Sequence, residues 1–136
     1  MLVVDDESSI RLLCRVNLRA AGMDVLEAEN GDSGLELARR ERPDLILLDV
    51  MMPGRDGWSV ARELADDPRT RGIPVVFLTA RADPADRHRG AELGGAGYVV
   101  KPFDPVSIAE LVEEVLARVE EGEGEPSGET GPEDER

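Results

Sequence analysis

The stretch that decides the fold is Asp44-Leu45-Ile46-Leu47-Leu48-Asp49-Val50-Met51-Met52-Pro53. It contains four consecutive aliphatic residues with no polar alternation, which is typical of a strand buried on both faces of a parallel sheet. Such a strand lies at the centre of its sheet, and this one ends in a carboxylate, Asp49. Open α/β sheets bind their ligands at the carboxyl ends of the strands. Asp49 is therefore the first candidate functional residue.

Length and composition limit what the chain can be. Its 136 residues suit one domain with its own core, and its one cysteine, Cys14, allows no disulfide within the chain. It has no apolar run long enough to span a bilayer and no signal-peptide pattern at its start. A net charge of −14 argues against direct binding of nucleic acid. We expect a soluble cytoplasmic protein whose direct partners include neither membrane nor nucleic acid.

The C-terminal segment differs in composition from the rest of the chain. Residues 120–136 carry eight acidic residues against one arginine and have no aliphatic side chain. Such a segment cannot bury enough apolar surface to offset the entropy that it would lose on ordering. We predict a folded domain over residues 1–119 and an acidic disordered tail over residues 120–136. No pattern of a further domain follows the folded part, so the chain is expected to be either a stand-alone protein or a fragment ending in a linker.

Strand and helix patterns alternate along the sequence. Apolar runs predict strands near residues 1–4, 23–28, 44–49, 74–79 and 98–100. Apolar residues at helical spacing predict helices near residues 8–21, 31–42, 58–67, 82–93 and 105–119. This alternation predicts an α/β fold with a doubly wound, five-stranded parallel sheet and five helices. Right-handed crossovers and one reversal of strand order then place the first and third strands side by side.

Two of the predicted helices carry more specific expectations. Ser8 is a candidate cap for the first helix, whose buried face should include Leu13, Cys14 and Leu18. The helix over residues 82–93 has the thinnest apolar face, and we expect it to be the least stable one.

Polar residues follow four of the strands, at the edge where parallel strands end together. Asp5 and Asp6 follow the first strand and Asp49 the third, while Thr79 and Lys101 end the fourth and fifth. Three neighbouring carboxylates repel one another unless a cation lies among them, and Mg²⁺ suits a shallow all-carboxylate site. Lys101 is the only lysine among 16 basic residues, and its ammonium is a compact point charge that a guanidinium does not supply. These groups could neutralise a transferring phosphoryl group, with Asp49 as its nucleophile.

Together, the motifs at the strand ends resemble the receiver domain of two-component response regulators, in the stand-alone form of a chemotaxis regulator. They are Asp5-Asp6, Asp49, Met52-Pro53-Gly54 with Asp56-Gly57, Thr79-Ala80 and Lys101-Pro102. The resemblance covers Leu2 to about Val119 and implies a flavodoxin-like sheet with strand order 2-1-3-4-5. It also associates Lys101-Pro102 with a cis peptide bond, whereas bonds before proline are mostly trans.

The resemblance implies how a phosphoryl group would be held. Asp49 would accept it from a histidine kinase or phosphotransfer protein, and the only reactions catalysed would be the chain's own phosphorylation and dephosphorylation. The Mg²⁺ ligands would be Asp5, Asp6, Asp49 and the backbone carbonyl of Met51. Lys101 would pair with the phosphoryl group.

The resemblance also implies how phosphorylation would be signalled. Thr79 and Tyr98 would move together as the switch, and Ala80 would leave room for the phosphoryl group. Their movement would change the face formed by the fourth helix, fifth strand and fifth helix. That face would act on a downstream protein partner or output domain, and the family pattern allows a homodimer on phosphorylation.

Other interpretations fit part of the pattern. An aspartate-nucleophile phosphatase or phosphotransferase would need a second Asp two residues after Asp49, where Met51 stands. A flavodoxin-like nucleotide binder would need a phosphate-binding loop after the first strand, where Asp5-Asp6-Glu7 would repel phosphate. Taken singly, Asp5 or Asp6 could simply cap a helix, and Tyr98 could be an ordinary strand residue. The five motifs together favour the receiver.

Overall fold

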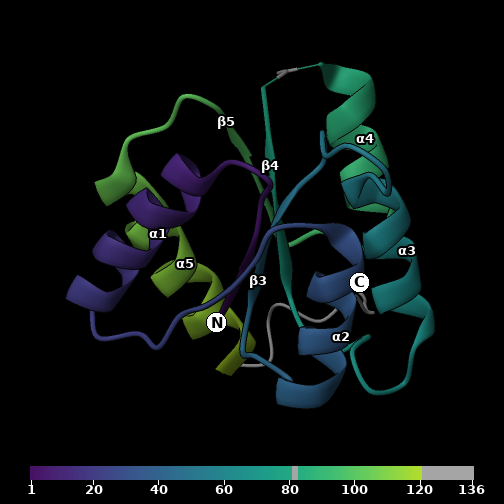
Figure 1. Ribbon diagram of the computed structural model, residues 1–136, viewed down its shortest axis with the longest axis horizontal. Helices are drawn as coiled ribbons and strands as arrows, with labels where there is room; N and C mark the ends of the chain where they lie inside the picture. Colours follow the sequence, from purple (N-terminus) through teal and green to yellow (C-terminus); the bar gives the residue numbers. More distant parts are fainter. Residues whose placement is uncertain (81–82, 121–136) are drawn as a thin grey trace, which may run out of the picture.

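The computed structural model describes residues 1–80 and 83–120 (Figure 1). The strands are β1 (Leu2–Val4), β2 (Leu26–Ala28), β3 (Ile46–Asp49), β4 (Val75–Thr79) and β5 (Gly97–Val100). The helices are α1 (Ser8–Ala20), α2 (Gly31–Glu41), α3 (Gly57–Asp66), α4 (Pro84–Glu92) and α5 (Pro105–Glu120). The predicted disordered tail lies outside the described residues, apart from Glu120, which ends α5.

All five strands run parallel in the order β2-β1-β3-β4-β5. In register, Val4 of β1 lies opposite Leu48 of β3, and Thr79 of β4 lies opposite Val100 of β5. The strand that was predicted to be central, β3, lies between β1 and β4. The predicted doubly wound α/β fold with strand order 2-1-3-4-5 is confirmed.

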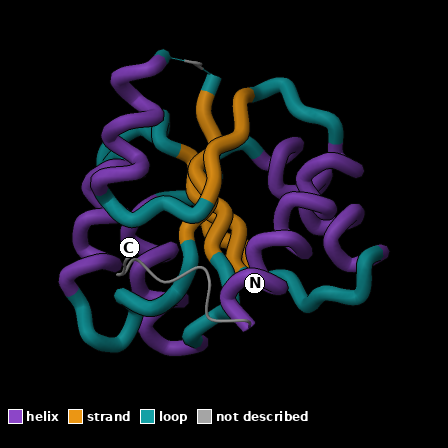
Figure 2. The backbone as a smooth tube through the Cα atoms, turned by 180° about the vertical axis from the view of Figure 1, so that it is seen from behind, coloured by secondary structure: helices purple, strands orange, loops and turns teal. Residues whose placement is uncertain are grey.

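The helices form two layers around the sheet. Helices α1 and α5 cover one face, and α2, α3 and α4 cover the other (Figures 1 and 2). Leu45 and Leu47 pack into the core with α1 and α5, whereas Ile46 and Leu48 pack into the core on the opposite face. Because both faces of β3 are buried, its sequence shows no polar alternation.

Short polar side chains start four of the helices. Asn30 Oδ1 accepts a hydrogen bond from Ser33 N–H at 2.9 Å, and Asp56 Oδ1 accepts one from Ser59 N–H at 2.9 Å. Asp83 and Asp104 accept equivalent bonds at the starts of α4 and α5. Each bond satisfies a backbone donor that the first turn of a helix leaves without a partner.

Helix α1 departs from its predicted start. Ser8 was expected to be its cap, but the cap position is occupied by Glu7, whose side chain makes no capping hydrogen bond, and Ser8 is the first helical residue. The reason is local, because Asp5 Oδ1 already accepts the backbone N–H of Glu7 at 2.9 Å and so fixes the entry into the helix.

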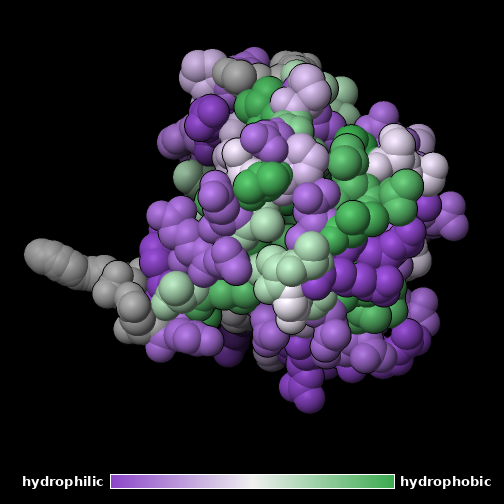
Figure 3. All heavy atoms as spheres, turned by 90° about the vertical axis from the view of Figure 1, so that its left-hand side faces the viewer, coloured by the Kyte–Doolittle hydropathy of each residue, from purple (hydrophilic) through white to green (hydrophobic). Residues whose placement is uncertain are grey.

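The buried face of α1 is also narrower than predicted. Cys14 and Leu18 are fully buried, but Leu13 is 39% exposed. Only a narrow stripe of the helix meets the sheet and α5, so further apolar residues face outward. Figure 3 shows apolar side chains among charged ones on the side of the molecule that α1 and α5 form. The large exposed apolar residues of these two helices are Leu12, Leu13, Val16 and Val106.

Helix α4 packs with little apolar surface, as its sequence predicts. Within Pro84–Glu92, Gly90 is the only buried residue. Two arginines of α4 lie over aromatic rings instead: Arg87 is 4.9 Å from the ring centre of Tyr98, and Arg89 is 5.0 Å from that of Trp58. None of the helices in the described part of the chain is long and apolar enough to cross a lipid bilayer.

Candidate functional site

Three carboxylates meet at the carboxyl edge of the sheet. Asp5 and Asp6 follow β1 and Asp49 ends β3, and one oxygen from each lies within 4.8 Å of the others. Asp5 is fully buried, Asp49 is 2% exposed and Asp6 is open to solvent. An all-oxygen cluster with one open side fits a hard divalent cation that retains some of its water, as Mg²⁺ does. The three carboxylates predicted as metal ligands are therefore brought together.

Backbone groups orient the two buried carboxylates. Asp49 Oδ1 accepts the N–H of Met51 at 3.0 Å, and Asp5 Oδ1 accepts the N–H of Glu7 at 2.9 Å. Arg11 donates from a guanidinium nitrogen to the carbonyl oxygen of Asp5 at 2.7 Å. In both carboxylates the second oxygen, Oδ2, is left to face Lys101.

Lys101 lies among three carboxylates. Its Nζ is 2.8 Å from Asp5 Oδ2, 3.1 Å from Glu7 Oε1 and 3.5 Å from Asp49 Oδ2. The Lys101 side chain is 13% exposed. The backbone N–H of Lys101 donates to the carbonyl oxygen of Thr79 at 2.6 Å, which continues the pairing of β5 with β4. The peptide bond between Lys101 and Pro102 is cis.

Burial and neighbouring charges shift the pKa values of Asp49 and Lys101. Burial raises the pKa of Asp49 to about 6, with the charge of Asp5 adding to the effect and the hydrogen bond from Met51 opposing it. Burial alone would lower the pKa of Lys101, but hydrogen bonds and charges from Asp5 and Glu7, together with the charge of Asp49, raise it to about 12. Lys101 is therefore a cation at neutral pH, whereas burial disfavours the charged form of Asp49.

The predicted switch residues lie on the two strands β4 and β5. Thr79 is fully buried, and Tyr98 is half-buried with a side-chain hydrogen bond to Thr79. Burial raises the pKa of Tyr98, so its hydroxyl stays protonated at neutral pH. Ala80, the residue after Thr79, is exposed. The side chain of Met51, two residues after Asp49, is 56% exposed.

Sequence reasoning missed three residues that shape the site. Glu7 was considered only as part of an acidic run, yet it pairs with Lys101 from the far end of the chain. Arg11 holds the backbone at Asp5. Gly57 packs against the end of β3, where an added Cβ would lie 2.6 Å from the Cα of Val50. Gly57 was quoted only as part of the family motif, and only the fold shows that it lies against the end of the strand that carries Asp49.

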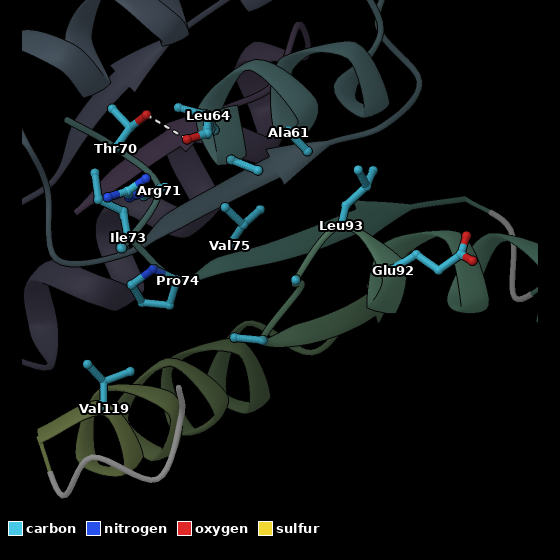
Figure 4. A pocket seen from close by; sticks show the side chains of 14 residues that line it. Ala61, Leu64, Thr70, Arg71, Ile73, Pro74, Val75, Glu92, Leu93 and Val119 are labelled. Atoms are coloured by element: carbon cyan, nitrogen blue, oxygen red, sulfur yellow. Dashed lines mark hydrogen bonds between the residues drawn. The ribbon is translucent and has the colours of Figure 1, made fainter. Parts of the chain in front are cut away.

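A separate cavity of about 600 Å³ lies near the amino end of β4 (Figure 4). Its walls are largely apolar and include Leu64, Val75, Leu93 and Val119. Thr70 lies in the wall, and its hydroxyl donates to the carbonyl oxygen of Leu64 at 2.8 Å. The lining contains none of the residues predicted from the strand ends, so this cavity is distinct from the carboxylate cluster.

Comparison with known proteins agrees with the geometry of the site. Residues 1–113 match the family described as "Response regulator receiver domain". The chemotaxis protein CheY4 of Vibrio cholerae superimposes with a TM-score of 0.80 at 32% identity, over 84% of this chain and 95% of that one. A putative response regulator from Chloroflexus aurantiacus gives a TM-score of 0.80 at 33% identity, over 86% of this chain and 96% of that one.

Curated relatives are longer proteins. The probable transcriptional regulator ycf27 of Porphyridium aerugineum is 42% identical over 88% of this chain and 49% of its own length. The transcriptional activator protein IrlR of Burkholderia pseudomallei is 46% identical over 87% of this chain and 50% of its own length. The chain thus spans about half the length of the curated relatives that it matches.

Proposed function

Because the chain belongs to the response regulator receiver domain family of two-component systems, we propose that it accepts a phosphoryl group on Asp49 from a histidine kinase or phosphotransfer protein. The proposal rests on one observation. Carboxylate oxygens of Asp5, Asp6 and Asp49 lie within 4.8 Å of one another, and Lys101 Nζ lies 3.5 Å from Asp49 Oδ2. An oxygen of Asp49 attacks phosphorus, the bond from phosphorus to the donor's imidazole nitrogen breaks, and its electron pair stays on that nitrogen.

The residues around Asp49 would prepare it for this transfer. Asp5, Asp6, Asp49 and the backbone carbonyl of Met51 would hold Mg²⁺, which when bound neutralises charge on the phosphoryl oxygens. Lys101 supplies a fixed positive charge on the opposite side. The hydrogen bond from Met51 N–H holds the carboxylate in one orientation, which lowers the entropy cost of attack.

The signal would leave the site through Thr79 and Tyr98. A phosphoryl group on Asp49 would attract the hydroxyl of Thr79, and the hydrogen bond between Thr79 and Tyr98 would carry that movement to β5. The low apolar burial of α4 supports this route, because an element with few buried contacts costs little to move. The face of α4, β5 and α5 would then favour a second state that the chain already samples.

The partners of the chain follow from this role. A phosphodonor protein must bring phosphohistidine to the open side of Asp6 and Asp49. The relatives that are transcriptional regulators support a downstream output domain or protein partner, and a homodimer on phosphorylation is part of the same proposal. We also propose that residues 1–119 fold independently as one domain.

The test is phosphorylation in the absence of a kinase. The chain is incubated with Mg²⁺ and acetyl phosphate, and intact-mass spectrometry should find one added phosphoryl group that is lost in base. Asp49→Asn should abolish the addition, whereas Asp44→Asn, at the other end of the same strand segment, should not. Labelling that persists in Asp49→Asn would contradict the proposal, and rapid release of phosphate from simple esters would favour the aspartate-nucleophile phosphatase instead.

A further inference from the structure

Glu7 is the outermost of the three carboxylates around Lys101. Its side chain is 55% exposed, whereas those of Asp5 and Asp49 are 0% and 3% exposed. Its Oε1 is nevertheless 3.1 Å from Lys101 Nζ, which is closer than the oxygen of Asp49 at 3.5 Å. Glu7 is not part of the carboxylate group that could hold a metal. It therefore contacts the ammonium and not the predicted metal position.

The position of Glu7 in the fold is unusual for its residue type. It occupies the cap position of α1, where Ser, Thr, Asp and Asn are preferred because their short side chains reach the first-turn donors. The Glu7 side chain makes no capping hydrogen bond. Its backbone is fixed instead by the bond from Glu7 N–H to Asp5 Oδ1. The longer side chain is directed across the site to β5.

We propose that Glu7 is a positioning residue that holds the ammonium of Lys101 at the rim of the site and gives it up when a phosphoryl group arrives on Asp49. This inference rests on the proposed function of Asp49. Of the three ion pairs of Lys101, the one with Glu7 is the most exposed to solvent. It therefore costs the least free energy to break. A phosphoryl group adds negative charge next to Asp49, so the ammonium shifts inward and leaves Glu7.

Glu7 thereby sets the occupancy of the phosphorylated state. Its ion pair with Lys101 exists before the phosphoryl group arrives and must be broken for the ammonium to move. Its charge also opposes the approach of an anionic phosphodonor. Removing the charge of Glu7 should therefore favour phosphorylation, although Glu7 touches neither the phosphoryl group nor the predicted metal position.

The first measurement uses the fact that Lys101 is the only lysine of the chain. Protein labelled with ¹⁵N at the lysine side chain gives one ammonium resonance, which needs no assignment. In wild type, the three carboxylates protect this ammonium from exchange with water. In Glu7→Gln, the resonance should shift and its proton exchange should be faster. Glu29→Gln is the matched control, because Glu29 is an exposed acid that follows β2 at the same edge of the sheet.

The second measurement is the affinity for beryllofluoride, a phosphoryl mimic, in the presence of Mg²⁺. Glu7→Gln should bind it about two- to fivefold more tightly, the size expected for the loss of one half-exposed ion pair. On binding, the Lys101 resonance of the wild type should move toward a position that it shares with the bound form of Glu7→Gln, because both ammonium groups then have the same partners. The rate of labelling by acetyl phosphate should rise by a similar factor.

Each result decides between clear alternatives. An unchanged ammonium exchange rate in Glu7→Gln would overturn the proposal, as would an equal gain in beryllofluoride affinity in Glu29→Gln, because the effect would then be one of net charge alone. Failure of the wild type to take up either the phosphoryl group or beryllofluoride would overturn the proposed function of Asp49. In that case the ammonium resonance would still report whether Glu7 holds Lys101 in the unmodified chain.

Discussion

Lys101, which follows β5, makes its shortest ion pair with Asp5, which follows β1, at 2.8 Å across the ends of the two strands that lie between them. Asp49 ends one of these intervening strands, so the contact places a cation directly beside the proposed phosphoacceptor. Asp5 is fully buried, and a buried carboxylate without a partner is costly. Lys101 therefore has a structural role in addition to its proposed chemical one.

Replacing Lys101 with methionine tests both roles. Lys101→Met should lower the free energy of unfolding by about 1–3 kcal/mol in magnesium-free buffer, because Asp5 and Asp49 lose their nearest cation. The loss should be smaller with Mg²⁺, while labelling by acetyl phosphate should fall sharply. Urea unfolding with and without Mg²⁺ measures the first effect. Arg19→Met, which removes an exposed cation of α1, should change stability by no more than about 0.5 kcal/mol. Equal losses in the two variants would contradict the prediction.

The raised pKa of Asp49 gives stability a dependence on pH. Because its folded-state pKa is about 6 and its ordinary value is 3.8, the folded chain retains a proton that the unfolded chain has already released between these two values. The contribution of Asp49 to stability should therefore fall as pH rises from about 4 to 6. At pH 7 without Mg²⁺, Asp49→Asn should be more stable than wild type by about 1–3 kcal/mol, and the difference should vanish near pH 4. Thermal unfolding of both proteins across this range is the measurement, and a difference independent of pH would refute the explanation.

The carboxylate cluster predicts how Mg²⁺ affinity responds to substitution. Asp5→Asn and Asp6→Asn should each weaken Mg²⁺ binding by about tenfold or more, or about 1.4 kcal/mol, because each removes one anionic ligand. Isothermal titration calorimetry measures this directly. Glu36→Gln, an exposed acid on α2, should leave the affinity nearly unchanged. Should it weaken binding as much as Asp6→Asn does, Mg²⁺ would be responding to net charge and not to a site.

Gly57 should be intolerant of even one added carbon. In Gly57→Ala, the new Cβ would meet the carbonyl oxygen of Asp49 at the end of β3 and would lie 2.6 Å from Val50 Cα. Backbone atoms cannot move away as the end of a flexible side chain can. We expect a loss of about 1–3 kcal/mol in stability and weaker Mg²⁺ binding, because Asp49 moves with the strand. Gly72→Ala is the matched control, since its Cβ would meet nothing within 4 Å. Equal stability of the two variants would disprove the proposed contact.

The arginine stacks on α4 predict how that helix is held. Arg89→Ala should remove its contact with the Trp58 ring and destabilise α4 locally by about 0.5–1 kcal/mol. Hydrogen exchange measured by NMR should show faster exchange in α4, with little change in α2. His88→Ala should have no such effect, because the side chain of His88 is 76% exposed and its contact with Glu92 lies on the surface. Unchanged exchange in Arg89→Ala would show that the stack does not hold the helix.

Much of the fold could be predicted because local signals agree with it. The apolar run before Asp49 specifies its strand, and apolar residues at helical spacing specify the helices, without help from the rest of the chain. The cluster of Asp5, Asp6, Asp49 and Lys101 followed from the strand order that the family resemblance implies, because parallel strands end at one edge.

The remaining features depend on contacts that are distant in sequence. The outward orientation of Leu13 depends on how much of α1 the neighbouring α5 covers, and spacing within α1 does not contain that information. Glu7 was missed because its partner, Lys101, lies 94 residues away in the sequence. For Gly57, only the packing of the folded chain shows that the start of α3 touches the end of β3.

β3 lies at the centre of the sheet and β5 at its edge, so we expect their backbone amides to exchange with water on two different timescales. The amides of β3 lie between strands on both sides, so they can exchange with water only when the sheet as a whole opens, whereas β5 pairs with β4 alone. Openings at the edge are therefore frequent events and openings at the centre are rare ones. The aspartate at the end of β3 can thus keep its position through many fluctuations of α4 and β5. If Asp49 accepts a phosphoryl group as proposed, the lifetime of that group would not be limited by the motions that signal it.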